Sequence, residues 1–584
     1  MENLETKRHS LAHIMAAAIK ELWPQAQLAI GPAIENGFYY DIDFQDIKLV
    51  ETDLKTIEKK MSHIIKQNLK FEKKEQNIDE AIKEIALEDN PYKLEIIEDL
   101  KKKGETMVSF YTVGKFTDLC RGPHIESTLK IKPGSFKLQS LAGAYWRGDE
   151  KNKMLTRIYG LAFEDKAELD AHLQLIIEAE KRDHRKLGKE LDLFCFSDLV
   201  GPGLPLFTPK GMIIIDELRN HIETVCRHYG FQKVMTPHLA KIGLYEISGH
   251  AKKFSDELFH VSSDKGHEFV MKPVQCPHQT QIYASKTRSY RDLPIKYMES
   301  EKQYRAEKSG EVGGLSRVYA ITVEDGHTFC RPDQVKEELI CLVNIIKDFY
   351  SALGLWGKHW VSLSVRDLDH PEKYIGEPAD WDICEKMLQE VSDDMGLDAK
   401  RMEGEAALYG PKLDFMFRDS LGKEIQIPTV QVDFATPKRF NLVYTDKDGS
   451  EKNPIMVHRA ILGSYERFLA LIIEHFAGAF PLWLSPVQVK IVSVSEAHVD
   501  ACEKLKRELQ AEDIRVEVDS GNETLGNKIR KTIAEKIPHT LVIGDKEAKL
   551  DNLSVRDRGQ NDSRTISKID FIAELKKNIK DKSL

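Results

Sequence analysis

The last hundred residues alternate short apolar runs with amphipathic segments, and this alternation limits them to one class of fold. The runs 488–494 (QVKIVSV) and 540–545 (TLVIGD) have the length and β-branched content of strands. Segments 496–509 and 523–537 place apolar residues three and four positions apart, as amphipathic helices do, and Pro538 ends the second. The pattern predicts a small α/β domain with a mixed, mostly parallel sheet.

The rest of the chain divides at changes in composition. Up to Phe163, helical stretches alternate with short strand-like runs and Gly-Pro turns, which is typical of an α+β domain. The charged segment that follows has no proline and carries Leu169, Leu173 and Ile176 at helical spacing, so it predicts a connecting helix. A Pro/Gly-rich entry then opens a long mixed region. We therefore expect an α+β multidomain protein with four parts: 1–165, 166–195, 196–482 and 483–584.

Composition excludes several classes of protein. The 584 residues suffice for about three or four ordinary domains, and 41% hydrophobic with 31% charged residues is typical of a soluble globular protein. No apolar run approaches the roughly 18 residues that span a bilayer, so we expect a cytoplasmic protein without a membrane partner. Eight scattered cysteines favour free thiols or metal ligands. With a net charge of -9, a nucleic acid would have to bind through local basic patches.

Two four-residue spacings in the first part bring together possible metal or catalytic side chains. On a helix, His9 and His13 would lie on one face, one turn apart. Cys120 and His124 repeat the spacing with a ligand pair that zinc accepts. The four could form a zinc site or a metal-free hydrolytic pocket, and buried core histidines are the alternative. Asp118, two residues before the cysteine, would face the same side of a strand and could orient an imidazole.

The stretch ESEKQYRAEKSGEVGGLSRVYAITVEDGHTFC reads as two strand-like runs around a Gly-rich turn. Arg305 and Glu307 lie on the first run, two residues apart and so on one side, and Arg317 opens the second. An arginine there can bind a phosphate or a carboxylate, and a glutamate can accept from an exocyclic amine such as that of adenine. A cross-strand ion pair on a solvated face is the alternative.

Three residues of the same region could form a Cys-His-His zinc site with an open fourth position. They are Cys276, His327 and His458. Because they lie far apart in the sequence, their spacing alone does not support the site.

The chain resembles the bacterial-type threonyl-tRNA synthetases, a family of class II aminoacyl-tRNA ligases, in the stretches HSLAH, DLCRGPH, EKRDHRKLGKELDLF, YRAEKSG, EDGHTFC, ALYGPKLDF and MVHRAILGSYERFLALIIEHFAGAFPLWLSPVQV. The resemblance covers essentially the whole chain. It implies an α+β editing domain, a class II catalytic domain with an antiparallel sheet, and a C-terminal α/β anticodon-binding domain.

The resemblance also implies an activity. The chain would ligate L-threonine to threonine tRNA through threonyl-adenylate, with Mg²⁺ on the ATP and one Zn²⁺ in the catalytic domain, and would act as a homodimer. Its first domain would hydrolyse mischarged seryl-tRNA. Family members usually have a small ubiquitin-like domain before HxxxH, and we expect this chain to lack it because the pair begins at residue 9.

Carried over position by position, the resemblance assigns roles. Pro237 looks like the motif 1 proline near the dimer interface. Arg305 resembles the arginine that binds the α-phosphate and the amino-acid carboxylate, Glu307 the residue that reads the adenine amino group, and Arg467 the motif 3 arginine at adenine and the γ-phosphate. The other assigned residues are zinc ligands (Cys276, His327, His458), substrate contacts (Arg317, Asp325, Tyr409, Lys412), editing residues (His9, His13, Asp118, Cys120, His124) and anticodon-reading residues (Asn522, Arg530, Glu547, Arg556).

Physical chemistry explains why such an enzyme needs two sites. Threonine and valine are nearly isosteric, so an apolar pocket separates them by no more than about a hundredfold. A zinc ion that binds both the amino and the hydroxyl group of threonine solves this problem. Serine offers the same two groups and lacks only a methyl group, a difference of about 1 to 3 kcal/mol. Some seryl-tRNA must form, and a hydrolytic site becomes necessary.

Three positions depart from the family pattern. The zinc cysteine is followed by CPHQ instead of Cys-Pro-Gly-His, which places His278 one position early. Ile321 and Val323 stand where the family has a phenylalanine that stacks on adenine and a glutamine near the substrate amine. Because the other site residues are retained, we expect an active enzyme. A catalytically silent tRNA-binding paralogue and a hydrolase that acts only through the first domain are the alternatives.

Overall fold

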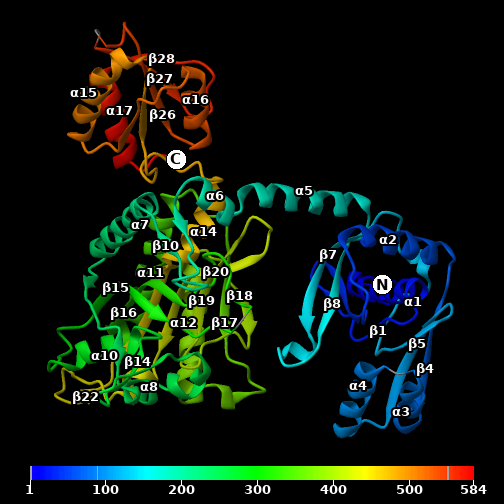
Figure 1. Ribbon diagram of the computed structural model, residues 1–584. Coiled ribbons are helices and arrows are strands. Elements are labelled where there is room, and N and C mark those ends of the chain that lie inside the picture. Colours follow the sequence, from blue (N-terminus) through cyan, green and yellow to red (C-terminus); the bar gives the residue numbers. More distant parts are fainter. Residues whose placement is uncertain (1–2, 89, 309, 549–550) are drawn as a thin grey trace. The chain divides into compact units, whose positions relative to one another are not determined.

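A computed structural model describes residues 3–88, 90–308, 310–548 and 551–584, and the chain forms two units, Met1–Ile177 and Glu178–Leu584 (Figure 1). The fold class expected from the sequence, a multidomain α+β protein, is confirmed. Within the described residues, no helix is both long enough and apolar enough to cross a membrane.

An alanine-rich helix lies at the centre of the first unit. Helix α1 (Leu4–Leu22) begins at Asn3, whose side chain caps the free N–H of Thr6, and residues Ser10 to Ile19 are buried along it. It packs on α2 (Glu51–Lys66) and on a five-stranded sheet. The strands of that sheet are β1 (Gln27–Leu28), β2 (Ala33–Ile34), β3 (Gly37–Asp43), β8 (Met154–Ala162) and β7 (Phe136–Tyr145).

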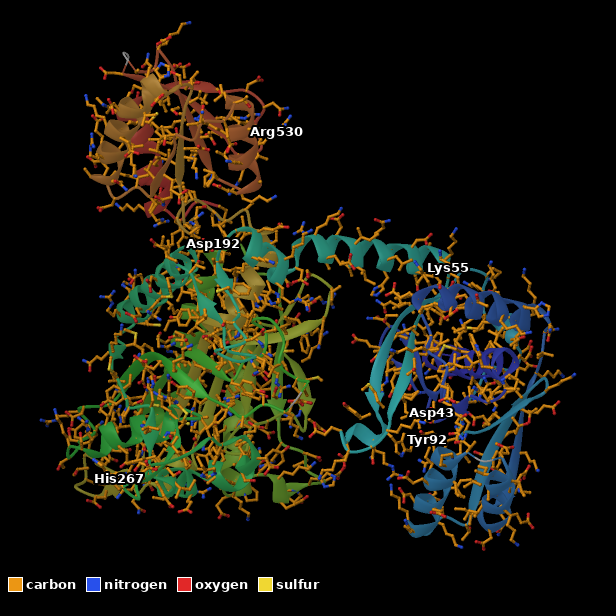
Figure 2. All side chains as sticks on the ribbon, in the orientation of Figure 1. Asp43, Lys55, Tyr92, Asp192, His267 and Arg530 are labelled. Atoms are coloured by element: carbon orange, nitrogen blue, oxygen red, sulfur yellow. The ribbon has the colours of Figure 1, made fainter. Side chains whose placement is uncertain are left out.

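A second, smaller layer completes this unit. Helices α3 (Ile78–Leu87) and α4 (Pro91–Lys102) share a hydrophobic cluster with a three-stranded sheet. Tyr92, on α4, donates a hydrogen bond of 2.7 Å to Asp43 at the end of β3 and so ties the two layers together (Figure 2). The strands of the small sheet are β4 (Phe71–Asn77), β5 (Met107–Val113) and β6 (Phe116–Leu119).

The sequence predicts one continuous connecting helix after residue 165, but the structure has two helices there. Helix α5 spans Lys166–Arg182 and helix α6 spans His184–Glu190, with Asp183 between them. The Asp183 carboxylate accepts from the backbone N–H of Arg185, so it caps a new helix. An N-cap inside a charged, proline-free run explains the break.

An eight-stranded sheet forms the core of the second unit. All its neighbouring strands are antiparallel except the two pairs at the edges. Helices α7 (Pro209–His228), α11 (Val335–Ser351), α12 (Pro378–Asp394) and α14 (Tyr465–Phe476) pack against it around one large hydrophobic core. In order, the strands are β11 (Gln232–Lys233), β15 (Ile295–Tyr304), β16 (Ala320–Cys330), β23 (Ile455–Ser464), β20 (Glu424–Asp433), β19 (Lys412–Arg418), β17 (Trp360–Val365) and β18 (Lys400–Glu403).

Smaller elements lie beside this sheet. Helix α10 (Cys276–Ala284) packs on β16, and its first residue is the cysteine of the expected zinc site. The others are α8 (Ile242–Ser248), α9 (His250–Lys253), α13 (Thr436–Arg439), the sheet of β12 (Leu239–Ala240), β14 (Glu268–Met271) and β13 (His260–Ser262), and the pairs β9 (Phe194–Cys195) with β10 (Leu206–Phe207) and β21 (Tyr444–Thr445) with β22 (Glu451–Lys452).

The C-terminal part has the strand and helix alternation that the sequence predicts. Its sheet is mixed, but only half of its strand pairs are parallel. The pairs β24–β25 and β24–β26 are parallel, whereas β26–β27 and β27–β28 are antiparallel. The last of these strands was not predicted. The elements are β25 (Val516–Asp519), β24 (Val489–Ser493), β26 (His539–Ile543), β27 (Asn552–Asp557), β28 (Arg564–Ser567), α15 (Val499–Gln510), α16 (Leu525–Ala534) and α17 (Lys568–Lys580).

Candidate functional site

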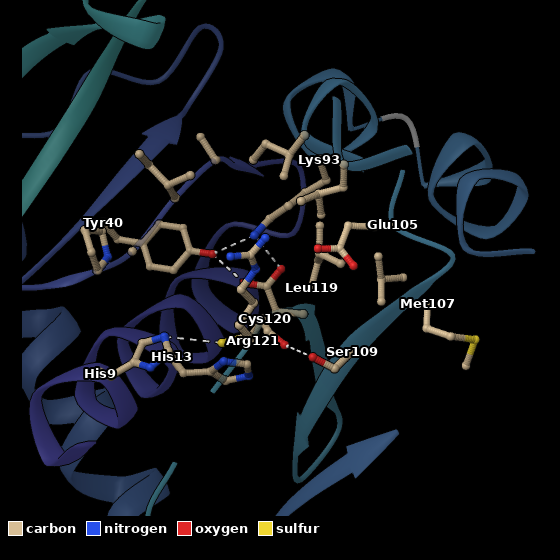
Figure 3. A pocket seen from close by; sticks show the side chains of 18 residues that line it. His9, His13, Tyr40, Lys93, Glu105, Met107, Ser109, Leu119, Cys120 and Arg121 are labelled. Atoms are coloured by element: carbon tan, nitrogen blue, oxygen red, sulfur yellow. Dashed lines mark hydrogen bonds and ion pairs between the residues drawn. The ribbon is translucent and has the colours of Figure 1, made fainter. Parts of the chain in front are cut away.

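The first unit holds a pocket of about 520 Å³ that collects the unusual side chains of its sequence (Figure 3). His9 and His13 reach it from α1, as the HxxxH spacing predicts, and Cys120 from the residue after β6. The Cys120 Sγ lies 3.2 Å from the Nε2 atoms of both His9 and His124. Two motifs more than a hundred residues apart therefore form one site.

Hydrogen bonds fix the tautomer of His124. The Ser10 hydroxyl donates to the carbonyl oxygen of Thr6 (2.8 Å), so its oxygen must accept from the Nδ1–H of His124 (3.1 Å). The Nε2 atom of His124 then carries a lone pair toward the Cys120 thiol. The thiol can donate its proton to only one of the two imidazoles, and the possible ligand atoms of His9, Cys120 and His124 lie within 4.8 Å of one another.

Burial keeps these groups neutral. It lowers the pKa of His13 to about 4 and that of His124 to about 2, and it raises the pKa of the Cys120 thiol to about 11. The pKa of His9 is also lowered by burial. His13 is 3% exposed, and its Nε2 has no hydrogen-bond partner among the described residues. At neutral pH the histidine side of the pocket is therefore uncharged.

Asp118 does not orient an imidazole by a hydrogen bond in the described structure, in contrast to the prediction. Strand β6 ends at Leu119, so the alternation that was to align Asp118 with Cys120 stops before the cysteine. The Asp118 carboxylate instead accepts from the Tyr40 hydroxyl and lies 2.8 Å from the Nζ of Lys93 (Figure 3).

Tyr40 and Lys93 are functional candidates that the sequence reading missed. Lys93 is only 6% exposed and sits four residues before the buried Ile97 of α4, so it interrupts an apolar helix face. A buried lysine needs a partner, and Asp118 supplies it. Tyr40 comes two residues after the buried Phe38 on β3, so both side chains face the same side of the sheet. A lysine on an apolar helix face and a tyrosine on the buried side of a strand are the signals in the sequence that point to these two residues.

The second unit brings Cys276, His327 and His458 together, although they are remote in sequence. His327 on β16 stands directly opposite His458 on β23, and their ring centroids are 4.7 Å apart. Cys276 approaches from α10. All three are buried, and their ligand atoms lie within 4.8 Å of one another.

Each histidine of this cluster is held from behind. The Nδ1 of His327 lies 2.8 Å from the Oε1 of Gln279, and the Nε2 of His458 lies 2.9 Å from a carboxylate oxygen of Asp433. The buried Nε2 of His327 has no hydrogen-bond partner among the described residues, and it lies 3.9 Å from a carboxylate oxygen of Asp325. Tyr409 stacks on His458 with centroids 5.0 Å apart. The cluster has the donor types and the outer contacts of a zinc site.

Next to the cluster is a second pocket of about 520 Å³, lined by Cys276, Asp325, Tyr409, His458 and the expected ATP-binding residues Arg305, Glu307, Arg317 and Arg467. Burial raises the pKa of Asp325 to about 7. Glu307 and Arg317 form an ion pair (2.6 Å), but it is not the cross-strand pair of the alternative interpretation, because both residues lie outside the strands and line the pocket.

The expected strand positions in this pocket were wrong. Strand β15 ends at Tyr304, so Arg305 and Glu307 lie beyond it, and Arg317 lies before β16. The backbone N–H of Arg305 still bonds to Tyr319, but that of Ala306 turns to Glu257, which ends the strand pairing.

The departures from the family pattern fall in two places. Ile321 and Val323 line the pocket, so its wall is apolar there. His278 is not among the residues of the zinc-type cluster, and its Nε2 lies 2.8 Å from the Tyr245 hydroxyl.

Lys412, an expected substrate contact, is outside the described lining of the pocket and pairs with Asp414.

The four expected anticodon-reading residues belong to the C-terminal part. Arg530 is exposed on α16 (Figure 2), and Asn522 is exposed just before that helix. Arg556 lies on β27, where its Nε donates to the carbonyl oxygen of Gln560 (3.3 Å). Glu547 accepts from the backbone N–H of Gly544 (3.1 Å).

Three protein families match the chain, each over one part of it. Residues 259–476 match the tRNA synthetase class II core domain (G, H, P, S and T), and residues 488–578 match the anticodon binding domain. Residues 108–159 match the threonyl and alanyl tRNA synthetase second additional domain.

Whole proteins match over nearly the full length. A threonine–tRNA ligase of Gloeobacter violaceus is 46% identical over 99% of this chain and 93% of its own, and one of Geobacillus kaustophilus is 46% identical over 100% and 88%. Among solved structures, the RNA binding domain of threonyl-tRNA synthetase from Cryptosporidium parvum is 33% identical, with a TM-score of 0.64 over 68% of this chain and 98% of that one. These likenesses confirm the resemblance, and the chain belongs to the threonyl-tRNA synthetase family.

Proposed function

We propose that the chain activates L-threonine with ATP and transfers it to threonine tRNA, and that its first unit hydrolyses mischarged seryl-tRNA. The main support is the position of Cys276, His327 and His458 beside a pocket that also holds Arg305 and Arg467. Soft and borderline metal ligands next to two arginines suit a small amino acid that reacts with a nucleotide.

We propose zinc as the metal of this cluster. The buried Nε2 of His327 has no hydrogen-bond partner among the described residues, so its lone pair would be free for the ion. When bound, zinc supplies a Lewis acid that takes the amino and hydroxyl groups of threonine, so valine would leave it without one ligand. Following the family, we propose one zinc per chain, held by Cys276, His327 and His458.

The residues of the pocket would bind and align the reactants. An oxygen of the threonine carboxylate attacks the α-phosphorus of ATP, a carbon–oxygen–phosphorus link forms, and the bond to the bridging oxygen breaks to release pyrophosphate with its Mg²⁺. Arg305 and Arg467 would neutralise charge on the phosphates, and Asp325 would hydrogen-bond to threonine. The 2′- or 3′-hydroxyl of the terminal ribose of the tRNA then attacks the carbonyl carbon of threonyl-adenylate, so that the ester forms, the bond to the phosphate oxygen breaks and AMP leaves.

In the editing pocket, Lys93 and Asp118 would stand on one side of the seryl ester and the neutral His9, Cys120 and His124 on the other. A water molecule would attack the ester carbonyl, and the Lys93 ammonium would stabilise the oxyanion that develops. The bond between the carbonyl carbon and the ribose oxygen would then break, which releases serine and restores the ribose hydroxyl of the tRNA.

The remaining parts of the proposal follow the family. Asn522, Arg530, Glu547 and Arg556 would read the anticodon. The protein would work in the cytoplasm as a homodimer, and Met235, two residues before Pro237, is 77% exposed and available to such an interface.

Threonine-dependent exchange of pyrophosphate into ATP tests the proposal. We expect exchange with threonine, slower exchange with serine and almost none with valine. Absence of exchange with all three, in a preparation that binds threonine tRNA, would contradict it.

A further inference from the structure

Gln279 lies at the base of the zinc-type cluster and is fully buried. Its side chain lies between two groups. The Oε1 atom is 2.8 Å from the Nδ1 of His327, and the Nε2 atom donates to the Oε2 of Glu299 at 3.2 Å. It stands where the family pattern Cys-Pro-Gly-His has its histidine.

Glu299 determines which way the Gln279 amide points. The Oε1 of Glu299 accepts from the backbone N–H and the hydroxyl of Thr236, at 2.6 and 2.9 Å, and lies 3.5 Å from the Nζ of Lys272. Lys272 is also fully buried and bonds to the Thr236 hydroxyl. Surrounded by donors, Glu299 is an acceptor, so Gln279 must present its NH₂ to Glu299 and its oxygen to His327.

The direction of the amide in turn determines the tautomer of His327. An oxygen that faces Nδ1 can only accept, so Nδ1 carries the proton. The lone pair of the imidazole is then on Nε2, which is buried and has no hydrogen-bond partner among the described residues. Because Nδ1 is occupied by Gln279, Nε2 is the nitrogen left to bind a metal shared with Cys276 and His458.

We infer that Gln279 is a positioning residue for metal binding: with Glu299 and Lys272 behind it, it holds His327 in the one tautomer that presents Nε2 to the metal. The inference rests on the zinc site of the proposed function. An amide cannot exchange donor and acceptor by moving a proton, as an imidazole can. Gln279, the last residue of CPHQ, therefore contacts His327 in one fixed direction.

The zinc dissociation constant of the full chain, from competition with a chromogenic chelator, tests this inference. Gln279→Met has a similar volume but neither hydrogen bond, and we expect about 10- to 100-fold weaker binding. Gln279→His can still accept from His327 and donate to Glu299, and should bind zinc within about threefold of the native chain. Gln281→Met makes the same change at an exposed position of α10 and should leave the constant unchanged.

The outcomes separate the inference from the zinc site itself. If the native chain binds no zinc, the proposed metal site is wrong, and the inference falls with it. If the native chain binds zinc and Gln279→Met binds it within twofold, the zinc site stands and the positioning role is wrong. Should Gln279→Met fail to fold, Gln279→His decides: retained affinity supports the role, and a folded variant with tenfold weaker binding contradicts it.

Discussion

The Nε2 of His184 accepts a hydrogen bond of 3.2 Å from the backbone N–H of Leu315. The other ring nitrogen, Nδ1, lies 2.8 Å from a carboxylate oxygen of Glu474 on α14. His184 is the first residue of α6, whereas Leu315 is buried in the turn between β15 and β16 that carries Arg317. The Gly314 backbone comes so close that a Cβ there would lie 2.3 Å from this Nε2. One imidazole therefore holds the turn that carries Arg317, which we propose to bind ATP, against two helices.

Replacement of His184 should weaken ATP binding. In His184→Asn the amide can still donate to Glu474 but no longer reaches Leu315, and the turn loses about 1 to 2 kcal/mol of positioning. We expect KM for ATP in pyrophosphate exchange to rise about tenfold, while deacylation of seryl-tRNA stays constant. Lys186→Asn, at an exposed position of the same helix, is the control. An unchanged KM would show that the turn is held in another way.

Acid should destabilise the first unit. Burial lowers the pKa of His13 from 6.5 to about 4, so between these values the unfolded chain binds more protons. The stabilising contribution is complete above pH 6.5 and is lost as the pH falls toward 4. The loss amounts to about 3 kcal/mol. The ¹⁹F signal of fluorotryptophan at Trp23, which follows α1, can report unfolding at each pH. Equal stability at pH 7 and pH 5 would contradict a buried, neutral His13.

Loss of Lys93 should harm both folding and editing. Lys93→Met leaves the Asp118 carboxylate buried without its cation, which costs about 3 to 5 kcal/mol. We expect a lower melting temperature for the first unit and a deacylation rate that falls at least a hundredfold. Lys101→Met, at an exposed position of the same helix α4, is the matched control. Normal deacylation by a folded Lys93→Met variant would remove this residue from the editing chemistry.

Removal of zinc should separate the two activities. Chelation, or Cys276→Ala, takes away several kcal/mol of substrate binding and activation, so threonine-dependent exchange should fall at least about a hundredfold. Deacylation of seryl-tRNA should continue, because its pocket does not use this cluster. Metal analysis should find one zinc per native chain and per chain of the exposed-cysteine control Cys195→Ala. Two zinc ions per chain would place a metal in the editing pocket as well.

Local patterns predicted local structure well in this chain. His9 and His13 share a helix face because their spacing fixes it, and most of segment 496–509 forms α15 because its apolar residues recur at the helical period. The classes of the first and last parts followed from such patterns, whereas the antiparallel sheet of the long middle region was expected from the family resemblance alone. The ends of helices and strands were predicted less accurately. Strand β15 ends at Tyr304, before the expected position, because the backbone N–H of Ala306 donates to Glu257, outside the strand pair.

Long-range geometry could not be read in the same way. His327 and His458 become neighbours only through the pairing of β16 with β23, and no spacing in the sequence states that register. Lys93 reaches Asp118 because α4 packs beside β6, so its role became visible only in the folded unit. The motifs identified what type of site to expect, and the fold supplied the partners.

The most direct measurement is the charging of threonine tRNA with threonine and with serine, by the native chain and by the His9→Ala, His13→Ala double variant. The account predicts threonyl-tRNA from both proteins and a build-up of seryl-tRNA from the variant alone. If neither protein forms threonyl-tRNA although both bind the tRNA, the chain is not an active ligase and the central claim is wrong.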